Sequence, residues 1–144
     1  MSTSQFGGTW RLQSYEIRGP HGEVSYPYGS DATGYLIYTE DGHMAAALMK
    51  ANRPNFRSAD IFAAGPDEKR TAYESFASYC GTYEVQEDKV IHHVEVSLFP
   101  NWSGSDQERF FEISADQLVL RTPFISAEGK AQTAIVTWQR VKPR

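Results

Sequence analysis

The chain has 144 residues, a length typical of one domain with its own hydrophobic core, and its 13% of aromatic residues favour an all-β core or an aromatic-lined pocket. The net charge of −4 with scattered lysines and arginines argues against a nucleic-acid-binding surface, and a single cysteine, Cys80, excludes an intrachain disulfide. Neither a secretory leader nor an apolar run of about 18 residues is present, so we expect a cytoplasmic protein that does not span a membrane.

The first half of the chain alternates apolar and polar residues in short runs that are separated by turn sequences. This pattern is typical of antiparallel strands, because successive side chains of a strand point to opposite faces. The predicted strands of this half are Gly8–Arg18, Gly22–Tyr26, Gly34–Thr39 and His43–Lys50. The last two are joined through Asp41-Gly42, where glycine supplies the positive φ of a tight hairpin.

The segment of residues 55–79 interrupts the strands and predicts one short helical insertion. Asp67 can accept hydrogen bonds from the free N–H groups at the start of this helix, as an N-cap. The apolar side chains recur at helical spacing, so we expect Phe76 and at least one of Tyr73 and Tyr79 to pack against the strands. Two roles stay open for the helix, because it can either lid a cavity or cover an apolar edge of the sheet.

Strand patterns resume after the insertion and continue to the end of the chain. The predicted strands are Cys80–Gln86, Lys89–Leu98, Glu108–Ser114, Gln117–Thr122 and Ala131–Val141. Short strands in mostly adjacent hairpins predict an all-β fold with a single closed antiparallel β-barrel of about eight to ten strands, because closure removes the unpaired sheet edges. The sequence has no repeat and no Gly/Ser linker, so we expect residues 1–144 to form one domain.

The strand predicted over Lys89–Leu98 carries apolar residues on one face and polar residues on the other. The polar face holds His93, Glu95 and Ser97, whereas His92 lies on the valine face and is predicted to be a hydrogen-bonded core residue. If the polar face lines a cavity, His93 and Glu95 form an acid–base pair that can move a proton. If it faces water, the strand is an ordinary half-exposed one, and the periodicity leaves both alternatives open.

Further residues are candidates for contact with a ligand. Arg109, on the following strand, can bind a carboxylate, enolate or phenolate oxygen, and Trp102, in the intervening loop, can cover an aromatic ligand. The remaining candidates for ligand binding are Tyr35, Met44, Tyr83 and Ser97. The histidines and carboxylates show no metal-ligand spacing, so we expect neither a metal nor a cofactor.

Motifs along the whole chain carry a family resemblance. The first strand opens with GTWRL and the last closes with TWQRV, which is similar to the closing device of lipocalins and implies that Trp10 contacts Arg140. Between them lie SYPYGSDATGYLIYTEDGHMAA, YCGTYEV and HHVEVSLFPNWSGSDQERF. In this order the motifs resemble the lipocalin-like domain proteins, small bacterial and fungal proteins with a calycin-type barrel. The resemblance implies an internal cavity and a helical insertion, but no particular chemistry.

Two function hypotheses follow. The first is a non-catalytic protein that binds a small hydrophobic or aromatic metabolite in the barrel cavity. The alternative is an isomerase or cyclase without cofactor, which acts on a polyketide-like natural-product intermediate through His93 and Glu95. Motifs for covalent hydrolysis, phosphoryl transfer and hydride transfer are missing from the sequence. In either case the expected partner is this small ligand, with no nucleic acid and no membrane, and a homodimer stays open.

Overall fold

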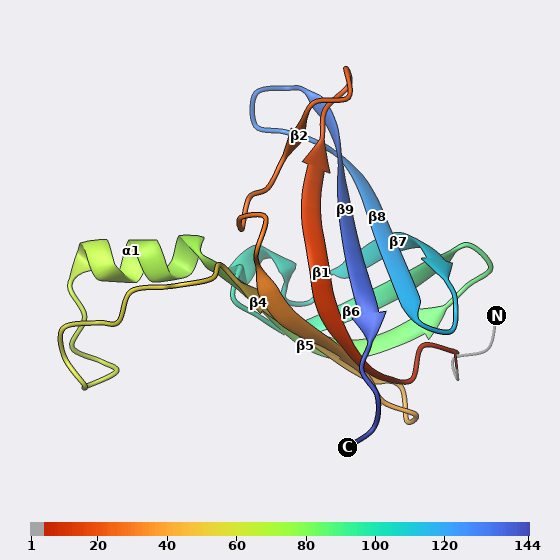
Figure 1. Ribbon diagram of the computed structural model, residues 1–144, viewed down its shortest axis with the longest axis horizontal. Coiled ribbons are helices and arrows are strands. Elements are labelled where there is room, and N and C mark those ends of the chain that lie inside the picture. The colour runs from red at the N-terminus through yellow and green to blue at the C-terminus, as the bar shows by residue number, and fades with distance from the viewer. Residues whose placement is uncertain (1–4) are drawn as a thin grey trace.

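Eight of the predicted strands close into an antiparallel barrel in the computed structural model, which describes residues 5–144 (Figure 1). The barrel strands are β1 (Gly8–Arg18), β3 (Thr33–Tyr38), β4 (His43–Met49), β5 (Phe76–Val85), β6 (Lys89–Ser97), β7 (Asp106–Ile113), β8 (Gln117–Ile125) and β9 (Ala131–Arg140). The short strand β2 (Val24–Ser25) pairs with the end of β1. The predicted closed antiparallel barrel with one short helix is confirmed.

The barrel closes where its first strand meets its last. β1 pairs with β3 along one edge and with β9 along the other, so the sheet returns to its starting strand. Trp10 lies opposite Arg140, whose guanidinium carbon is 4.1 Å from the centroid of the indole ring. The indole N–H donates to the carbonyl of Phe6 (2.9 Å), and Arg140 donates to the carbonyl of Gly7 (2.8 Å). The predicted contact between Trp10 and Arg140 is therefore confirmed, and such a cation–π pair contributes about 0.5–2 kcal/mol.

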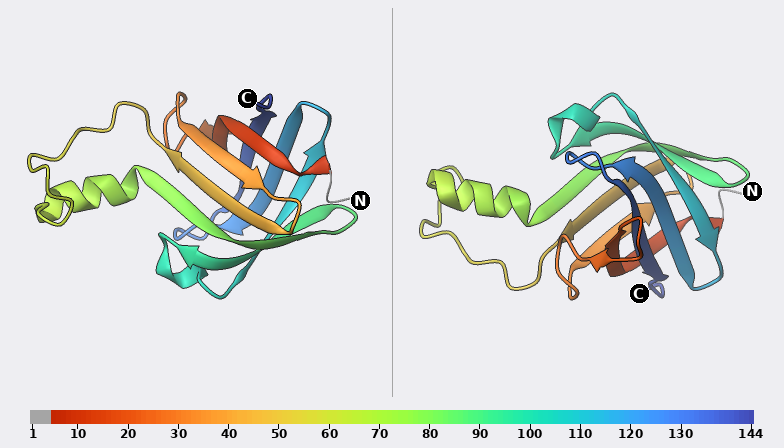
Figure 2. Two further views of the ribbon diagram at one scale, coloured as in Figure 1. Left: turned by 90° about the horizontal axis from the view of Figure 1, so that it is seen from below. Right: turned by 90° about the horizontal axis from the view of Figure 1, so that it is seen from above.

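Buried apolar side chains fill the barrel at the end where the β3–β4, β5–β6 and β7–β8 hairpins turn. We call them the apolar core, which comprises Phe6, Trp10, Leu12, Leu36, Met44, Tyr83, Val90, Leu118 and Trp138. Phe6 precedes β1 and lies across the barrel, with its ring edge-on to Tyr38 and Phe111 at centroid distances of 5.4 and 5.0 Å. Loops 19–32, 50–75, 98–105 and 126–130 lie at the opposite end of the strands (Figure 2).

The helical insertion extends away from the barrel instead of packing on it. α1 (Pro66–Glu74) has no buried residue, and Figures 1 and 2 show that it projects beyond the start of β5. Asp67 is not the N-cap, because the helix begins after Gly65, and Glu68 accepts a hydrogen bond from the Gly65 N–H (3.3 Å). Both expected roles of the helix, as a lid on a cavity and as a cover of an apolar sheet edge, are therefore wrong. Among residues 5–144, no helix is long and apolar enough to cross a membrane.

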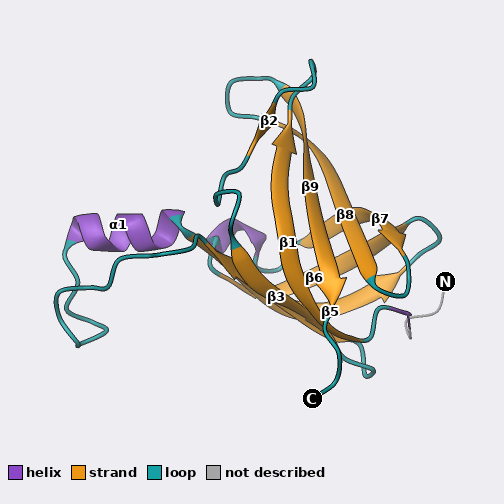
Figure 3. Ribbon diagram, viewed as in Figure 1, coloured by secondary structure: helices purple, strands orange, loops and turns teal. Residues whose placement is uncertain are grey.

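Phe76 and Tyr79 lie in β5 and not in the helix. Figure 3 shows that this strand starts directly after α1. Phe76 pairs with Met49 of β4, and Tyr79 pairs with Ala46. The pairing between β4 and β5 therefore includes Phe76, the first residue after Ser75. Tyr79 does pack against the core, but as an inward-facing strand residue, whereas Phe76 is half-buried on the outer face. The apolar spacing in this segment fits both a helix and a strand, and sheet pairing decides between them.

Candidate functional site

A β-bulge in β6 decides which residues of this strand face the barrel interior. In the pairing with β5, Gly81 lies opposite Val94 and Cys80 lies opposite Val96. Glu95 is therefore the extra residue of the bulge, and the alternation of side chains shifts by one position after it. The backbone approaches Gly81 so closely that a Cβ atom there would lie 2.0 Å from the carbonyl oxygen of His93, so this position requires glycine.

Because of this shift, the predicted polar row does not lie on one face. His92 faces inward before the bulge, and Ser97 faces inward after it, opposite Tyr79. His93 lies on the outer surface, and Glu95 is exposed. The expectation that His93 and Glu95 share an internal cavity with Ser97 is wrong, because a regular period of two does not include a bulge.

On the outer surface, His93 lies between two carboxylates. Its Nδ1 is 2.6 Å from Oδ1 of Asp106 in β7, and its Nε2 is 2.9 Å from Oε1 of Glu84 in β5. The hydrogen bond with Asp106, together with that to Glu84, raises the pKa of His93 above its usual value. These three side chains link three neighbouring strands on the outside of the barrel.

Inside the barrel, beside the apolar core, lies a second group of side chains with hydrogen-bonding atoms. We call it the polar cluster, which comprises Tyr15, Tyr38, Tyr79, His92, Gln107 and Arg109. Cross-strand neighbours share a face of the sheet, and Gln107 pairs with the buried His92, while Arg109 pairs with the buried Val90. The cluster therefore draws on the inner faces of β1, β3, β5, β6 and β7.

His92, which is 1% exposed, bridges two tyrosines of the polar cluster. Its Nε2 is 2.6 Å from the Tyr38 hydroxyl, and its Nδ1 is 2.6 Å from the Tyr79 hydroxyl. Burial lowers the pKa of His92 to about 3, and the charge of Arg109 acts in the same direction. The imidazole is therefore neutral, so one ring nitrogen donates and the other accepts. The prediction of a hydrogen-bonded core histidine is confirmed, but its two partners lie on other strands and gave no signal in the sequence.

Arg109 places a positive charge inside the barrel. Its guanidinium donates to Oε1 of Gln107 (3.2 Å) and to the carbonyl of Glu108 (3.1 Å), and it forms no ion pair with a carboxylate within residues 5–144. Burial raises the pKa of Tyr15 and of Tyr79, and the charge of Arg109 opposes both changes. Arg109 is half-buried although it faces inward, so water reaches this part of the interior.

A chain of hydrogen bonds joins the polar cluster to the β6–β7 loop. Nε2 of Gln107 donates to Oγ of Ser105 (3.1 Å), which donates to the carbonyl of Trp102 (2.7 Å). Trp102 ends the short 3-10 helix η2 (Pro100–Trp102), and its ring is edge-on to Tyr79 at a centroid distance of 5.8 Å. Trp102 therefore borders the polar cluster.

Two buried polar atoms on the inner wall have no hydrogen-bond partner among residues 5–144. They are Oγ of Ser97 and Nε1 of Trp138. Ser97 lies opposite Tyr79, and Trp138 lies opposite two buried leucines of the apolar core. Burying such a group without a partner costs about 1–3 kcal/mol, so each of these two atoms is a local cost to the fold.

Ser97, Trp102 and Arg109 are the predicted ligand contacts that lie at or beside the polar cluster. Tyr35, the remaining candidate on β3, faces outward, is 44% exposed and lies under the Arg11 guanidinium at 5.0 Å, so the structure does not bring it to the polar cluster. Met44 and Tyr83 are buried in the apolar core. The Tyr83 hydroxyl donates to the carbonyl of Thr39 (2.9 Å), which ties it to the β3–β4 hairpin.

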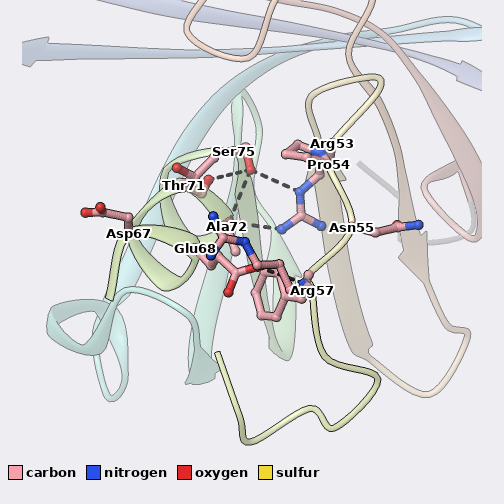
Figure 4. Close-up of a pocket in the computed structure, with 10 residues that line it drawn as sticks. Arg53, Pro54, Asn55, Arg57, Asp67, Glu68, Thr71, Ala72 and Ser75 are labelled. Atoms are coloured by element: carbon pink, nitrogen blue, oxygen red, sulfur yellow. Dashed lines mark hydrogen bonds between the residues drawn. The ribbon is translucent and has the colours of Figure 1, made fainter. Parts of the chain in front are cut away.

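The insertion forms a separate pocket of about 270 Å³ outside the barrel (Figure 4). Arg53 reaches across it and donates to Oγ of Ser75 (3.0 Å) and to the carbonyl of Ala72 (3.0 Å). Glu68 accepts a hydrogen bond from the backbone N–H of Arg57 (3.0 Å). These polar groups bond to one another and hold the loop against α1. Within the described residues, no group of three or more His, Cys, Asp or Glu side chains is arranged to hold a metal ion.

The sequence is similar to known proteins over most of its length. The 4′-hydroxy-3′-methoxypropiophenone carrier protein of Aspergillus oryzae is 30% identical over 108 residues, which cover 68% of this chain and 96% of the relative. The model of the lipocalin-like domain family matches residues 7–141, a range that includes every barrel strand and the whole polar cluster. The chain therefore belongs to the lipocalin-like domain family.

Proposed function

We propose that this protein binds and carries a small aromatic molecule with oxygen substituents, held inside the barrel at the polar cluster. Membership of the family and similarity to a protein named as a carrier support small-molecule binding. The observation that carries the proposal is the polar cluster itself, a set of hydrogen-bonding groups on the inner wall of a barrel and beside an apolar core.

The polar cluster and its neighbours suit a flat and partly polar ligand. Tyr79 and Trp102 offer aromatic surface, while Arg109 and Ser97 offer donors to an oxygen atom. Ala46 lies opposite Tyr79 on the inner wall and has only a methyl group. A small residue at this position fills little of the inner wall beside the tyrosine, where we propose that the ring of the ligand lies.

The barrel end opposite Phe6 offers a route to the polar cluster. Exposed apolar side chains lie where β6 and β8 reach this end, namely Val96, Leu98, Phe99, Phe124 and Ile125. Exposed apolar groups that gather in one region often mark a binding surface. Their position supports the passage of an apolar ring into the barrel from this side.

Binding of 4′-hydroxy-3′-methoxypropiophenone, measured by isothermal titration calorimetry, tests the proposal. The variant Ala46→Trp fills the inner wall opposite Tyr79, so we expect it to weaken binding by roughly tenfold or more. The matched control Ala45→Trp places the same side chain on the outer face of the same strand, where Ala45 is exposed. We expect Ala45→Trp to bind as the wild type does.

Two results would reject the proposal. The first is a folded wild-type protein, judged by circular dichroism, that does not bind this aromatic ketone. The second is equal binding by the wild type and by folded Ala46→Trp, because the ligand would then lie elsewhere, for example in the pocket of the insertion.

The isomerase or cyclase alternative stays a hypothesis. Its predicted acid–base pair, His93 and Glu95, lies on the outer surface, so catalysis inside the barrel would need other groups. Recovery of the bound ligand after incubation distinguishes the two functions. A carrier returns the ligand unchanged, whereas an enzyme returns an isomer or a ring-closed product.

A further inference from the structure

We propose that the polar cluster holds its aromatic ligand as an anion, with an ionised phenol oxygen between the guanidinium of Arg109 and the hydroxyl of Tyr79. This inference rests on the proposed function and specifies the ligand class as an acidic phenol. A phenol that is conjugated to a carbonyl group belongs to this class, because its anion is delocalised.

The charges of the barrel wall favour an anion in the interior. The acidic residues of the described strands lie on the outer face or at the bulge and are Glu16, Glu84, Glu95, Asp106, Glu108 and Glu112. Arg109 is a charged side chain on the inner face, and it has no carboxylate partner within residues 5–144. A half-buried cation without a counter-charge attracts an anion more strongly than an exposed cation does.

The directions of the two hydrogen bonds to His92 leave one tyrosine hydroxyl free to donate near Arg109. A neutral imidazole donates to one tyrosine and accepts from the other, so one tyrosine keeps a hydroxyl hydrogen for another partner. Tyr38 is 1% exposed and has no further hydrogen-bond partner among the residues described, so its hydrogen is best used on His92. The free hydroxyl hydrogen then belongs to Tyr79, whose pKa responds to the nearby Arg109 charge.

The other groups around the site cannot neutralise the charge of Arg109. Tyr15, Tyr38 and Tyr79 keep their protons because burial raises their pKa values, and the pKa of His92 is lowered to about 3. The site therefore presents donors and one positive charge at neutral pH. An acidic phenol that binds here passes its proton to solvent, and its oxygen accepts charge-assisted hydrogen bonds.

Comparison of 4′-hydroxy-3′-methoxypropiophenone with its methyl ether, 3′,4′-dimethoxypropiophenone, tests the inference. The ether keeps the ring and the ketone of the phenol, but a methyl group replaces the ionisable hydrogen. At a pH about one unit below the pKa of the free phenol, we expect the wild type to bind the phenol roughly tenfold more tightly than the ether. The ultraviolet spectrum of the bound phenol should be that of the anion, which absorbs at longer wavelength than the neutral form.

The variant Arg109→Met should bind both ligands equally and leave the bound phenol neutral. The matched control Arg11→Met removes an arginine from the outer surface, so it should keep the wild-type preference. If Arg109→Met does not fold, the wild-type spectrum alone decides. Equal binding of the two ligands by the wild type, or a neutral bound phenol, overturns the inference but leaves the proposed function intact, whereas binding of neither ligand rejects the proposed function.

Discussion

The apolar core and the polar cluster share the interior of one barrel, but Trp10 of the core and Arg109 of the cluster differ in how fully their polar groups are paired. In the core, Trp10 is fully buried, donates its N–H to the Phe6 carbonyl and lies under Arg140. In the cluster, Arg109 is half-buried and has no carboxylate partner within residues 5–144, and Ser97, which lies opposite Tyr79, has no hydrogen-bond partner there. From this difference we expect stability and the proposed binding to depend on separate parts of the barrel interior, since an unpaired donor adds nothing to the fold but can bond to a ligand.

Replacement of two tryptophans should give the largest contrast between these regions. Trp10→Ala removes a fully buried ring, its hydrogen bond to Phe6 and its contact with Arg140, so we expect a loss of about 3–5 kcal/mol in the free energy of unfolding. Trp102→Ala removes a half-buried ring at the border of the polar cluster, and we expect a loss of about 1 kcal/mol. Urea unfolding of both variants checks the order.

Equal losses for the two tryptophans would contradict the separation of the core from the cluster. A second measurement sharpens the contrast, because Trp102→Ala should weaken binding of the aromatic ketone although it costs little stability. A Trp102→Ala variant that binds like the wild type would place the ligand away from this side of the cluster.

The two tyrosines that bond to His92 mark the boundary between the regions. Tyr38→Phe leaves Nε2 of His92 buried without a partner beside the core, so we expect a loss of about 1–3 kcal/mol in the free energy of unfolding. Tyr79→Phe frees Nδ1 on the side of the cluster that water reaches, and we expect a loss of about 1 kcal/mol or less. Thermal unfolding of both variants tests this order, and a larger loss for Tyr79→Phe would show that the cluster side is the drier one.

The sequence predicts the barrel well because strand alternation, hairpin turns and the pairing of Trp10 with Arg140 are local or family signals. The orientation of β6 could not be predicted in the same way. One extra residue, Glu95, changes the face of every later side chain in the strand, and the requirement for glycine at position 81 is visible only once β5 and β6 are paired.

The polar cluster is predictable in part. The residue type and the strand of Arg109 predict that it binds an oxygen anion, and Arg109 does face inward. The bridge through His92 was not predicted, because Tyr38 and Tyr79 come from strands that are distant in sequence. An isolated histidine in an apolar strand signals a buried hydrogen bond, but only the folded barrel supplies its partners.

The smallest expected effect concerns the adjacent histidines, which lie on opposite sides of the barrel wall. The pKa of His93 is raised by Asp106 and Glu84, whereas the pKa of His92 is lowered to about 3 by burial. In an NMR titration, His93 should therefore take up its proton above the pH of an unfolded histidine, and His92 should stay neutral over the same range.

The opposite shifts also give the two histidines opposite effects on stability. A raised folded pKa means that the contribution of His93 is fully present below the unfolded value of about 6.5 and is lost as pH rises through the folded pKa. The contribution of neutral His92 is instead lost as pH falls from about 6.5 toward about 3. Of the two histidines, only His93 therefore changes the stability above about pH 6.5. The thermal midpoint of the wild type should exceed that of His93→Gln slightly at about pH 6, and the difference should vanish by about pH 9, because partly exposed ion pairs contribute little. If the difference in thermal midpoint instead grew with pH, the ion pairs of His93 with its two carboxylates would not stabilise the barrel.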